Sequence, residues 1–290
     1  MAEASIPVDL LNPGQVFACL GFMEAAEILC GRSAGRFEYQ GRDVAARFVI
    51  SADGPQYPVS EVLHFLARAE VKSVAPLGSG LSTEKAKIET VQSEGSIFPS
   101  AVPESSATLP IMLTDKEHLI PIDHWADGSD RDNVKFWAGM AGYPGAALAR
   151  DALSLVRDLG DNALAAAVAD PFDVMAPQSS TFRFDWRHDY IPLDTGFSLN
   201  AHSGMTSVGY PFVELLAAIG MQNARPARVN PRDKLAYRYG VSSAMLPTVF
   251  ARAVLGGESL GFPIRLFRMR LGWPGQEGQA RCIVDAQEET

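Results

Sequence analysis

Two stretches of this chain are apolar at almost every position, and the rest alternates between short apolar and polar runs. The first stretch, residues 13–30, opens with Pro-Gly-Gln and continues Val-Phe-Ala-Cys-Leu-Gly-Phe-Met, and the second, residues 211–220, reads Pro-Phe-Val-Glu-Leu-Leu-Ala-Ala-Ile-Gly. A proline suits the first turn of a helix, and neither stretch offers a polar face to water. Both are predicted to be buried helices, the first with Asn12 as its N-cap and with Gly31 ending it.

Shorter patterns predict strands and further helices in the rest of the chain. Alternating apolar residues between turn residues indicate strands, and apolar positions three or four residues apart indicate helices. The predicted strands are residues 5–10, 35–40, 44–51, 109–113, 119–123, 181–186, 235–240 and 263–271, with a hairpin turn at 41–43. The predicted helices are residues 58–71, residues 246–255 and an alanine-rich run at 134–168 that is interrupted at 142–145 and at 160.

The phrase Ile-Pro-aliphatic-Asp occurs three times, at residues 6–9, 120–123 and 191–194. The first and third copies precede the two apolar helices, which suggests that two parts of the chain are built alike. Short strand-turn-helix phrases also recur by chance in mixed folds. The sequence does not decide between duplication and chance.

Residues 72–107 interrupt the hydrophobic pattern. They hold eight serines together with several glycines and prolines, a composition typical of loops and mobile insertions. A loop of this length is usually functional or disordered. Residues 78–85 are rich in glycine and serine but lack the Gly-Lys-Ser/Thr of a phosphate-binding loop, so no nucleotide loop is predicted.

This order of elements divides the chain into five predicted segments. They are an N-terminal α+β unit at 1–71, a flexible insertion at 72–107, strands at 108–132, a helical segment at 133–175 and a C-terminal α+β unit at 176–290. Strands, helices and strands follow one another in blocks. We therefore expect an α+β fold with mixed or antiparallel sheet units, buried helices and a central helical segment, and not a doubly wound sheet.

Composition is typical of a globular protein from a reducing compartment. The chain has 290 residues and is 47% hydrophobic, which allows a sizeable core. Cys19, Cys30 and Cys282 form no close pair, and we expect them to stay reduced. The start resembles no signal peptide, and no run is apolar enough for a membrane span. We expect a cytoplasmic protein with no membrane partner.

Charge is distributed unevenly along the chain. The formal net charge is −9, yet residues 221–272 contain nine lysines and arginines against two carboxylates, Asp233 and Glu258. A basic block on an acidic body points to a polyanion, while a solvated surface of ion pairs explains the same composition. The candidate nucleic-acid contacts in this block are Arg225, Arg228, Arg232, Lys234, Arg238, Arg265, Arg268 and Arg270.

Tyrosines and arginines interleave in the first predicted strand of the basic block. Strand alternation puts Tyr237 and Tyr239 on one face and Arg238 on the other. The tyrosines would either stack on bases or pack in the core.

The second strand of the block carries three arginines. Alternation aligns Arg268 with Arg270 but sends Arg265 to the opposite side. An aligned pair suits consecutive phosphates, whose binding depends on salt and not on base sequence. Edge-strand arginines that discourage aggregation fit the same pattern.

Residues that would carry catalysis or hold a metal form no known pattern. The five histidines are scattered, with no His-x-x-x-His pair and no cysteine-rich partner for zinc. Aspartates and histidines gather in residues 123–127 and 185–189, but turn-forming aspartates and strand-end histidines explain both groups more simply than a metal. No Gly-x-Ser-x-Gly elbow occurs. We predict no catalytic residues, no metal site and no cofactor.

Several parts of the chain together resemble one protein family. They are residues 7–21, Asp-His-Trp at 123–125 with Lys-Phe-Trp-Ala-Gly at 135–139, and Phe-Arg-Phe-Asp at 182–185 with the apolar helix at 211–220. In this order they are similar to the short CRISPR-associated subunit of type I-U systems, also called I-G, of the Csb/Csx class. The similarity covers most of the chain and rests on packing and turn residues.

The resemblance implies a non-enzymatic, small Cas-eight-like component of a Cascade effector complex. Such a subunit would bind CRISPR RNA and target DNA beside the backbone and RNA-processing subunits, while a separate helicase-nuclease is recruited. It also implies that the basic block contacts phosphates and that Lys135 and Trp137 form a second nucleic-acid contact.

Two other functions stay open. A small-molecule enzyme would have its site between the two similar α+β units, in a deep polar pocket with a carboxylate or histidine of perturbed pKa. A purely structural assembly subunit would use the basic block to bind acidic protein surfaces. Charge reversal at Arg268 and Arg270 would separate nucleic-acid binding from both.

Overall fold

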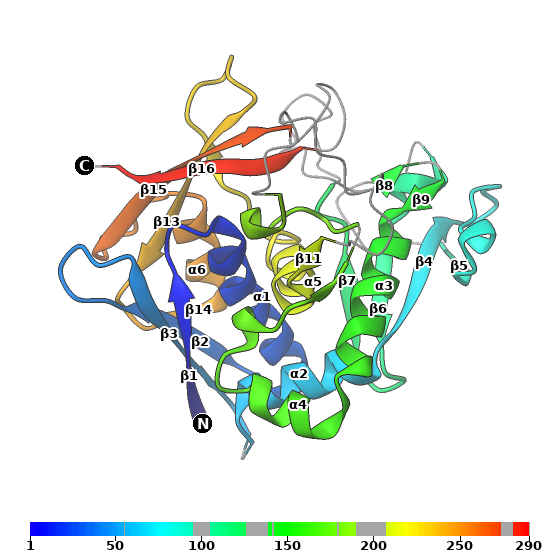
Figure 1. The fold of residues 1–290 in the computed structure, drawn as a ribbon, viewed down its shortest axis with the longest axis horizontal. Helices are drawn as coiled ribbons and strands as arrows, with labels where there is room; N and C mark the ends of the chain where they lie inside the picture. The colour runs from blue at the N-terminus through cyan, green and yellow to red at the C-terminus, as the bar shows by residue number, and fades with distance from the viewer. Residues whose placement is uncertain are drawn as a thin grey trace.

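Two buried helices occupy the centre of the fold, and three four-stranded sheets lie around them (Figure 1). The structure is a computed structural model. It describes residues 1–54, 56–94, 105–125, 139–140, 142–178, 180–189, 207–273 and 281–289. Within these ranges the strand pairs are antiparallel, except that β4 (Glu70–Pro76) runs parallel to β5 (Thr90–Ser93). The fold is α+β, as the sequence predicts.

Helix α1 (Pro13–Cys30) is the first of the central helices. The Asn12 side chain accepts a hydrogen bond from the Gln15 N–H at 3.4 Å, which satisfies one of the donors that a helix start leaves free. Gly31 follows the helix with a φ of +107°, a conformation that glycine adopts at little cost. The side chains from Pro13 to Ala26 are all buried. The predicted helix and both of its ends are confirmed.

Helix α5 (Pro211–Gly220) is the second central helix and touches α1. A Cβ on Gly21 would lie 1.8 Å from the Leu216 carbonyl oxygen, and one on Gly220 would lie 2.2 Å from the Phe17 carbonyl oxygen. Only glycine at these two positions lets the backbones approach so closely. Every residue of α5 is buried, so the second apolar helix is confirmed as well.

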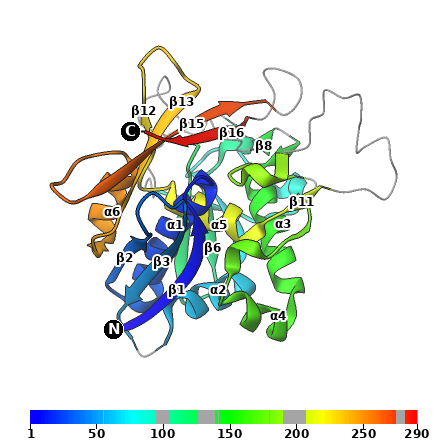
Figure 2. The same cartoon turned by 60° about the vertical axis from the view of Figure 1, so that its left-hand side comes forward.

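The first sheet, with the order β1-β3-β2-β14, packs against α1 (Figure 2). β1 (Ala2–Asp9) and β2 (Ser33–Glu38) both pair with β3 (Ala45–Ala52), which confirms the predicted hairpin. β14 (Leu246–Pro247) joins the edge of this sheet and leads directly into helix α6 (Thr248–Leu255). C-terminal residues therefore complete the N-terminal sheet.

The second sheet, with the order β12-β13-β15-β16, carries the basic block. β12 (Ala227–Arg228), β13 (Ala236–Ser242) and β15 (Ile264–Gly272) come from the block itself. β16 (Cys282–Glu288) pairs along β15. The sequence analysis does not predict β16, because only its first two residues are buried and no clear alternation follows.

The third sheet, with the order β5-β4-β6-β7, corrects the prediction for residues 58–107. Helix α2 (Pro58–Arg68) ends before the expected residue, and β4 begins at once and pairs with β6 (Ile111–Thr114). β7 (Leu119–Ile122) closes the other edge. The predicted insertion thus contains two strands, β4 and β5. They were missed because partner strands, and not a strong local pattern, hold them in the sheet.

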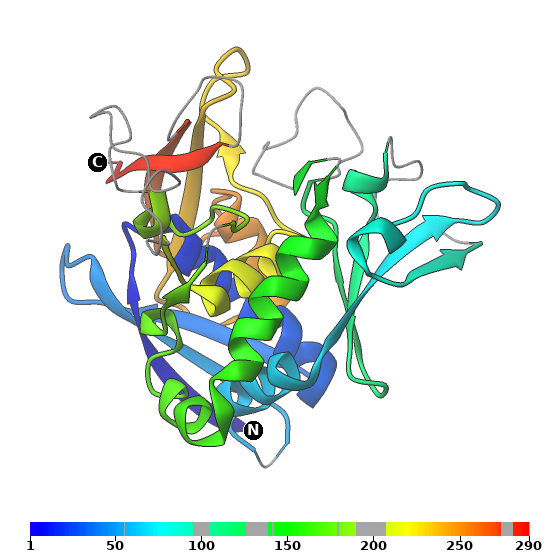
Figure 3. The same cartoon turned by 45° about the vertical axis from the view of Figure 1, so that its right-hand side comes forward.

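The alanine-rich helical segment is confirmed from Gly145 onward, whereas Gly139 and Met140, predicted as helix, form a short strand. α3 (Gly145–Asp158) packs between α5 and β4, as Figure 3 shows, and α4 (Gly160–Ala167) follows it. Before α3, β8 (Gly139–Met140) pairs with β9 (Tyr143–Pro144). The predicted helix start at 134–138 lies outside the described residues.

The predicted strand at residues 181–186 is wrong. Arg183 has a φ of +65°, which interrupts an extended strand, and the chain then forms a 3-10 turn at Trp186–Asp189. The two N–H groups after Arg183 donate to the side chain of Glu214 and not to a neighbouring strand.

One hydrophobic core cluster connects these elements. It extends from Ile6 in β1 to Ile283 in β16, and all five predicted segments contribute side chains to it. A short pair, β10 (Ala176–Pro177) with β11 (Val208–Gly209), lies beside the 3-10 turn. Among the described residues, no helix combines the length and the apolarity that a membrane crossing requires.

Candidate nucleic-acid interface

Three arginines of the second sheet share one face. The ladder between β13 and β15 sets Arg238 directly opposite Arg268, and Arg270 opposite Ala236. Directly opposite residues, and residues two apart along a strand, lie on the same side of a sheet. Arg238, Arg268 and Arg270 are therefore neighbours, and we call them the arginine face.

Arg268 is the least satisfied member of the arginine face. No ion pair of Arg268 is found within the described ranges, and its Nε is buried there without a hydrogen-bond partner. Like charges that stand directly opposite one another destabilise an antiparallel pair. An anion bound between Arg238 and Arg268 would relieve both problems.

The other two arginines are paired with carboxylates near the surface. Arg238 pairs with Glu289, and the arginine side chain is 39% exposed. Arg270 Nη1 lies 3.8 Å from Asp233 Oδ2, and this arginine side chain is 47% exposed. Exposed ion pairs contribute at most about 1 kcal/mol. A phosphate can therefore replace either carboxylate at little cost.

Arg265 lies on the opposite face of β15, as strand alternation predicts, and has a structural role. Its side chain is 10% exposed, and its Nε donates to Glu288 Oε1 at 2.8 Å. Its Nη atoms donate to the carbonyl oxygens of Arg42 and Asp43, and its guanidinium lies 4.6 Å from the centroid of the Tyr39 ring. Because these contacts occupy the whole guanidinium, we leave Arg265 out of the candidate interface.

Arg228 and Arg225 are also turned away from the arginine face. Arg228 stands opposite Tyr237 in the ladder and donates to the Pro231 carbonyl oxygen at 3.1 Å. Arg225 acts electrostatically on the buried carboxylate of Asp123. Both cations therefore belong to the protein's own polar contacts.

The other predicted contacts lie on a turn or outside the described residues. Arg232 and Lys234 are exposed on the turn between β12 and β13, which projects from the body in Figures 1 and 3. They can extend the arginine face. Lys135 and Trp137 lie outside the described residues.

The two tyrosines of β13 are core residues. Tyr237 is 1% exposed and Tyr239 is 0% exposed. The Tyr239 hydroxyl donates to the Leu10 carbonyl oxygen at 2.8 Å, and its ring stacks on Phe267 with centroids 5.3 Å apart. Burial raises the pKa of both tyrosines. Neither ring is accessible to a nucleic-acid base. The arginine face therefore offers positive charge, and these two tyrosines add no surface on which bases could stack.

Buried polar groups join the segment before the 3-10 turn to the central helices. Glu214, in the first turn of α5, accepts hydrogen bonds from the N–H groups of Phe184 and Asp185 at 3.3 and 2.9 Å. Asp185 accepts a hydrogen bond from Asn12 Nδ2 at 3.1 Å and forms a bidentate pair with Arg187. Burial raises the pKa of Glu214 to about 7. The sequence prediction does not include this cluster, although a lone acid in an apolar helix is a signal for it.

Asp123, at the end of β7, is a second buried carboxylate. Its backbone N–H donates to the Gln222 side chain, while both carboxylate oxygens are buried without a hydrogen-bond partner in the described part of the chain. Burial raises the pKa of Asp123 to about 8, and Arg225 only partly opposes this effect. The group is therefore mainly protonated at neutral pH, which avoids a buried negative charge.

The Ile-Pro-aliphatic-Asp phrase ends a strand in both described copies. Asp9 donates its N–H to Gln15 Oε1 at 2.7 Å, and Asp123 makes the matching bond to Gln222. The third copy, at residues 191–194, lies outside the described residues. The duplication stays a prediction.

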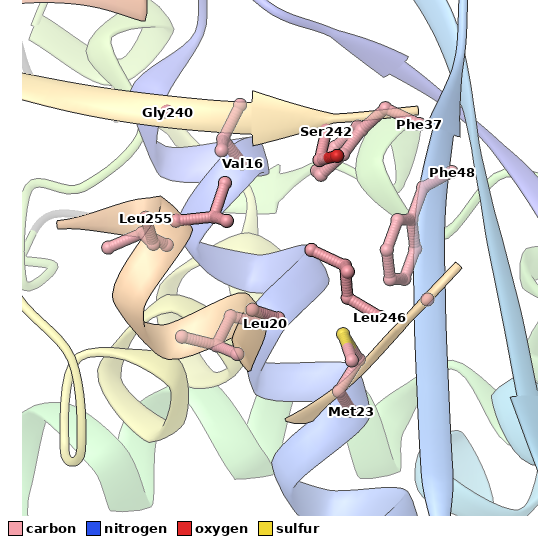
Figure 4. Close-up of a pocket in the computed structure, with 12 residues that line it drawn as sticks. Val16, Leu20, Met23, Phe37, Phe48, Gly240, Ser242, Leu246 and Leu255 are labelled. Atoms are coloured by element: carbon pink, nitrogen blue, oxygen red, sulfur yellow. The ribbon is translucent and has the colours of Figure 1, made fainter. Parts of the chain in front are cut away.

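A small apolar cavity lies between α1, α6 and the strands around them (Figure 4). Its volume is about 30 Å³, and its walls include Leu20, Met23, Phe48 and Leu255. The polar residue in its lining is Ser242, whose hydroxyl donates to the Pro263 carbonyl oxygen. The cavity has room for no more than a few water molecules. It does not supply the deep polar pocket that a small-molecule enzyme would need.

Comparisons with known proteins give no relative. No protein-family model matches this chain, and no curated protein or solved structure matches it. Among the described residues, no three His, Cys, Asp or Glu side chains gather as metal ligands would. The case for a function therefore rests on the sequence and on the geometry of the arginine face.

Proposed function

We propose that this chain is a non-catalytic subunit of a CRISPR RNA-guided Cascade complex of the type I-U class, and that its arginine face binds a nucleic-acid backbone. The observation that carries the proposal is the direct opposition of Arg238 and Arg268, where the Arg268 Nε is buried and has no hydrogen-bond partner among the described residues. The family resemblance seen in the sequence supports the same function.

A phosphate diester is the anion that best fits the arginine face. A guanidinium binds phosphate oxygens through parallel N–H bonds. Opposite residues of an antiparallel pair have Cα atoms about 5 Å apart, and residues two apart along a strand lie about 7 Å apart. Arg270 lies along the strand from Arg268 and Arg238 lies across the sheet from it, so the three positions form a right angle. Several cations this close together suit linked phosphates better than a single small anion.

The arginine face would recognise charge and not base sequence. Phosphate contacts position a nucleic acid without reading its bases, and the tyrosines that could stack on bases are buried. In RNA-guided recognition, base pairing between guide and target supplies the specificity. A subunit that holds the backbone of CRISPR RNA or target DNA needs no more than this.

The chain would assemble with the backbone and RNA-processing subunits of the complex, and a separate helicase-nuclease would be recruited to the target. The complex would act in the cytoplasm.

The test is co-expression of the tagged chain with its neighbouring operon products, followed by sequencing of the nucleic acid that co-purifies. We expect short RNAs of uniform length with a common repeat-derived end. The double variant Arg268→Gln, Arg270→Gln should lower the affinity of the purified chain for a labelled oligo-uridylate by about tenfold or more, since bonds to charged groups contribute about 1.5 to 3 kcal/mol each.

The matched control is the double variant Arg32→Gln, Arg68→Gln. Each of these exposed arginines makes an ion pair, with Asp53 and Asp115 respectively, and neither belongs to the second sheet, so the same charge is removed outside it. Equal losses in the two double variants would show that total charge and not the arginine face matters. A chain that retains neither RNA nor partner subunits would overturn the proposed function.

A further inference from the structure

The last strand brings carboxylates to the arginine face. β16 sets Gln287 opposite Arg268 and Asp285 opposite Arg270. After the strand, the Glu289 N–H donates to the Leu266 carbonyl oxygen at 2.8 Å, which fixes the backbone there. The Glu289 side chain then pairs with Arg238. The second sheet therefore places a carboxylate of the chain itself beside the arginine face.

Arg238 is held in place between this carboxylate and a glycine. A Cβ on Gly257 would lie 3.3 Å from Arg238 Cδ, so the arginine stem lies close against that turn. Its guanidinium meets Glu289 at the end of this stem. The carboxylate thus takes the position beside Arg238 from which a phosphate would bind.

The neighbouring Glu288 has a different role. It faces the other side of the sheet and pairs with Arg265, whose side chain is 10% exposed. The two carboxylates are similarly exposed, Glu289 at 23% and Glu288 at 26%, but the Arg238 side chain is 39% exposed and therefore more open than Arg265. Opening the Arg238–Glu289 pair leaves the contacts of Arg265 with Arg42, Asp43 and Tyr39 in place.

We propose that Glu289 is an internal competitor of the nucleic acid, which occupies Arg238 in the free protein and is displaced when a phosphate binds. This inference rests on the proposed function of the arginine face. Because Glu289 must leave Arg238 before a phosphate can bind there, the competition weakens the binding of a polyanion at Arg238. Stable retention then requires a backbone that engages Arg268 and Arg270 at the same time.

The experiment compares Glu289→Gln with Glu89→Gln in the full-length chain. Glu89 forms an exposed pair with Lys72 in the third sheet, far from β16 in Figure 1, so the control removes the same charge elsewhere. Binding of a fluorescein-labelled oligo-uridylate is measured by anisotropy. Glu289→Gln should tighten binding about two- to fivefold, the size of an exposed ion pair, and Glu89→Gln should leave it unchanged.

A double-mutant cycle decides whether Arg238 mediates the effect. If Glu289 acts through Arg238, the gain disappears in the Arg238→Gln background. Wild-type affinity in Glu289→Gln, or an equal gain in Glu89→Gln, would overturn the competition and leave the proposed function intact. Absence of binding by both the wild type and Glu289→Gln would overturn both.

Discussion

Arg183 and Glu214 show how a strained backbone and a buried charge can support each other. The left-handed φ of +65° at Arg183 turns the next two N–H groups the same way, and such pairs form a concavity that binds anions. The Glu214 carboxylate fills it from α5. A left-handed residue other than glycine costs about 1 to 2 kcal/mol. Two hydrogen bonds to a carboxylate offset that cost.

The raised pKa of Glu214 predicts that stability falls as pH rises. Its pKa goes from 4.5 to about 7 on folding, so within this window the folded chain holds a proton that the unfolded chain has released. The contribution of Glu214 to the free energy of unfolding is then greatest below pH 4.5, decreases up to about pH 7, and no longer changes above it. The raised pKa of Asp123 likewise lowers the free energy of unfolding as pH rises from 3.8 to about 8.

Chemical denaturation at a series of pH values checks this prediction. Glu214→Gln should flatten the decrease between pH 4.5 and about 7, and Asp123→Asn should flatten it between pH 3.8 and about 8, which includes the range above pH 7 that Glu214 does not affect. Glu84→Gln is the control, because Glu84 is exposed on a 3-10 turn. Unfolding free energies that rise between pH 4.5 and 8, or a decrease that survives both substitutions, would contradict the raised pKa values of Glu214 and Asp123.

At the scale of elements, the contact between α1 and α5 depends on two glycines. Gly21→Ala would place its Cβ 1.8 Å from the Leu216 carbonyl oxygen, so the helices must separate. Overpacking of a close contact typically costs 1 to 3 kcal/mol, and because a backbone atom blocks the way here we expect a loss of about 3 kcal/mol in denaturant unfolding. Gly80→Ala is the control, since nothing lies within 4 Å of that position. Equal stability of the two variants would show that the helices are further apart than described.

The elements that could be predicted are those whose signals are local. Helix α1 has its cap, its proline and its final glycine within its own sequence, and the β2–β3 hairpin has its turn. β4 and β16 could not be predicted, because they depend on pairing with β6 and β15. The strand expected at residues 181–186 failed for a related reason, since the acceptor of its N–H groups is a side chain distant in sequence.

At the scale of the whole molecule, a net charge of −9 coexists with one basic face. The composition reveals the basic block, and alternation separates Arg265 from Arg268 and Arg270. Neither composition nor alternation reveals that β13 places Arg238 opposite Arg268, or that β16 adds carboxylates to the same sheet. Those facts depend on the register between strands, which a single sequence leaves undefined.

The number of arginines on the face predicts the salt dependence of binding. Each phosphate that is neutralised on a single strand contributes about −0.7 to the slope of log K against log salt. Contacts from Arg238, Arg268 and Arg270 should therefore give a slope of about −2 with oligo-uridylate, and each single arginine-to-glutamine variant should reduce it by about 0.7. Anisotropy titrations over a range of salt concentrations measure it. A slope near zero, or one that the three substitutions leave unchanged, would exclude these contacts.

The packing of α1 against α5 also determines when the chain can fold. The two helices are far apart in sequence, and folding that depends on such distant contacts is slow because a long loop must close first. During synthesis, α1 and its sheet emerge well before α5, β14 and α6 are available. The part of the α1 surface that packs against α5 and α6 therefore has no partner until most of the chain has been made, and the N-terminal unit is not expected to fold as an independent domain.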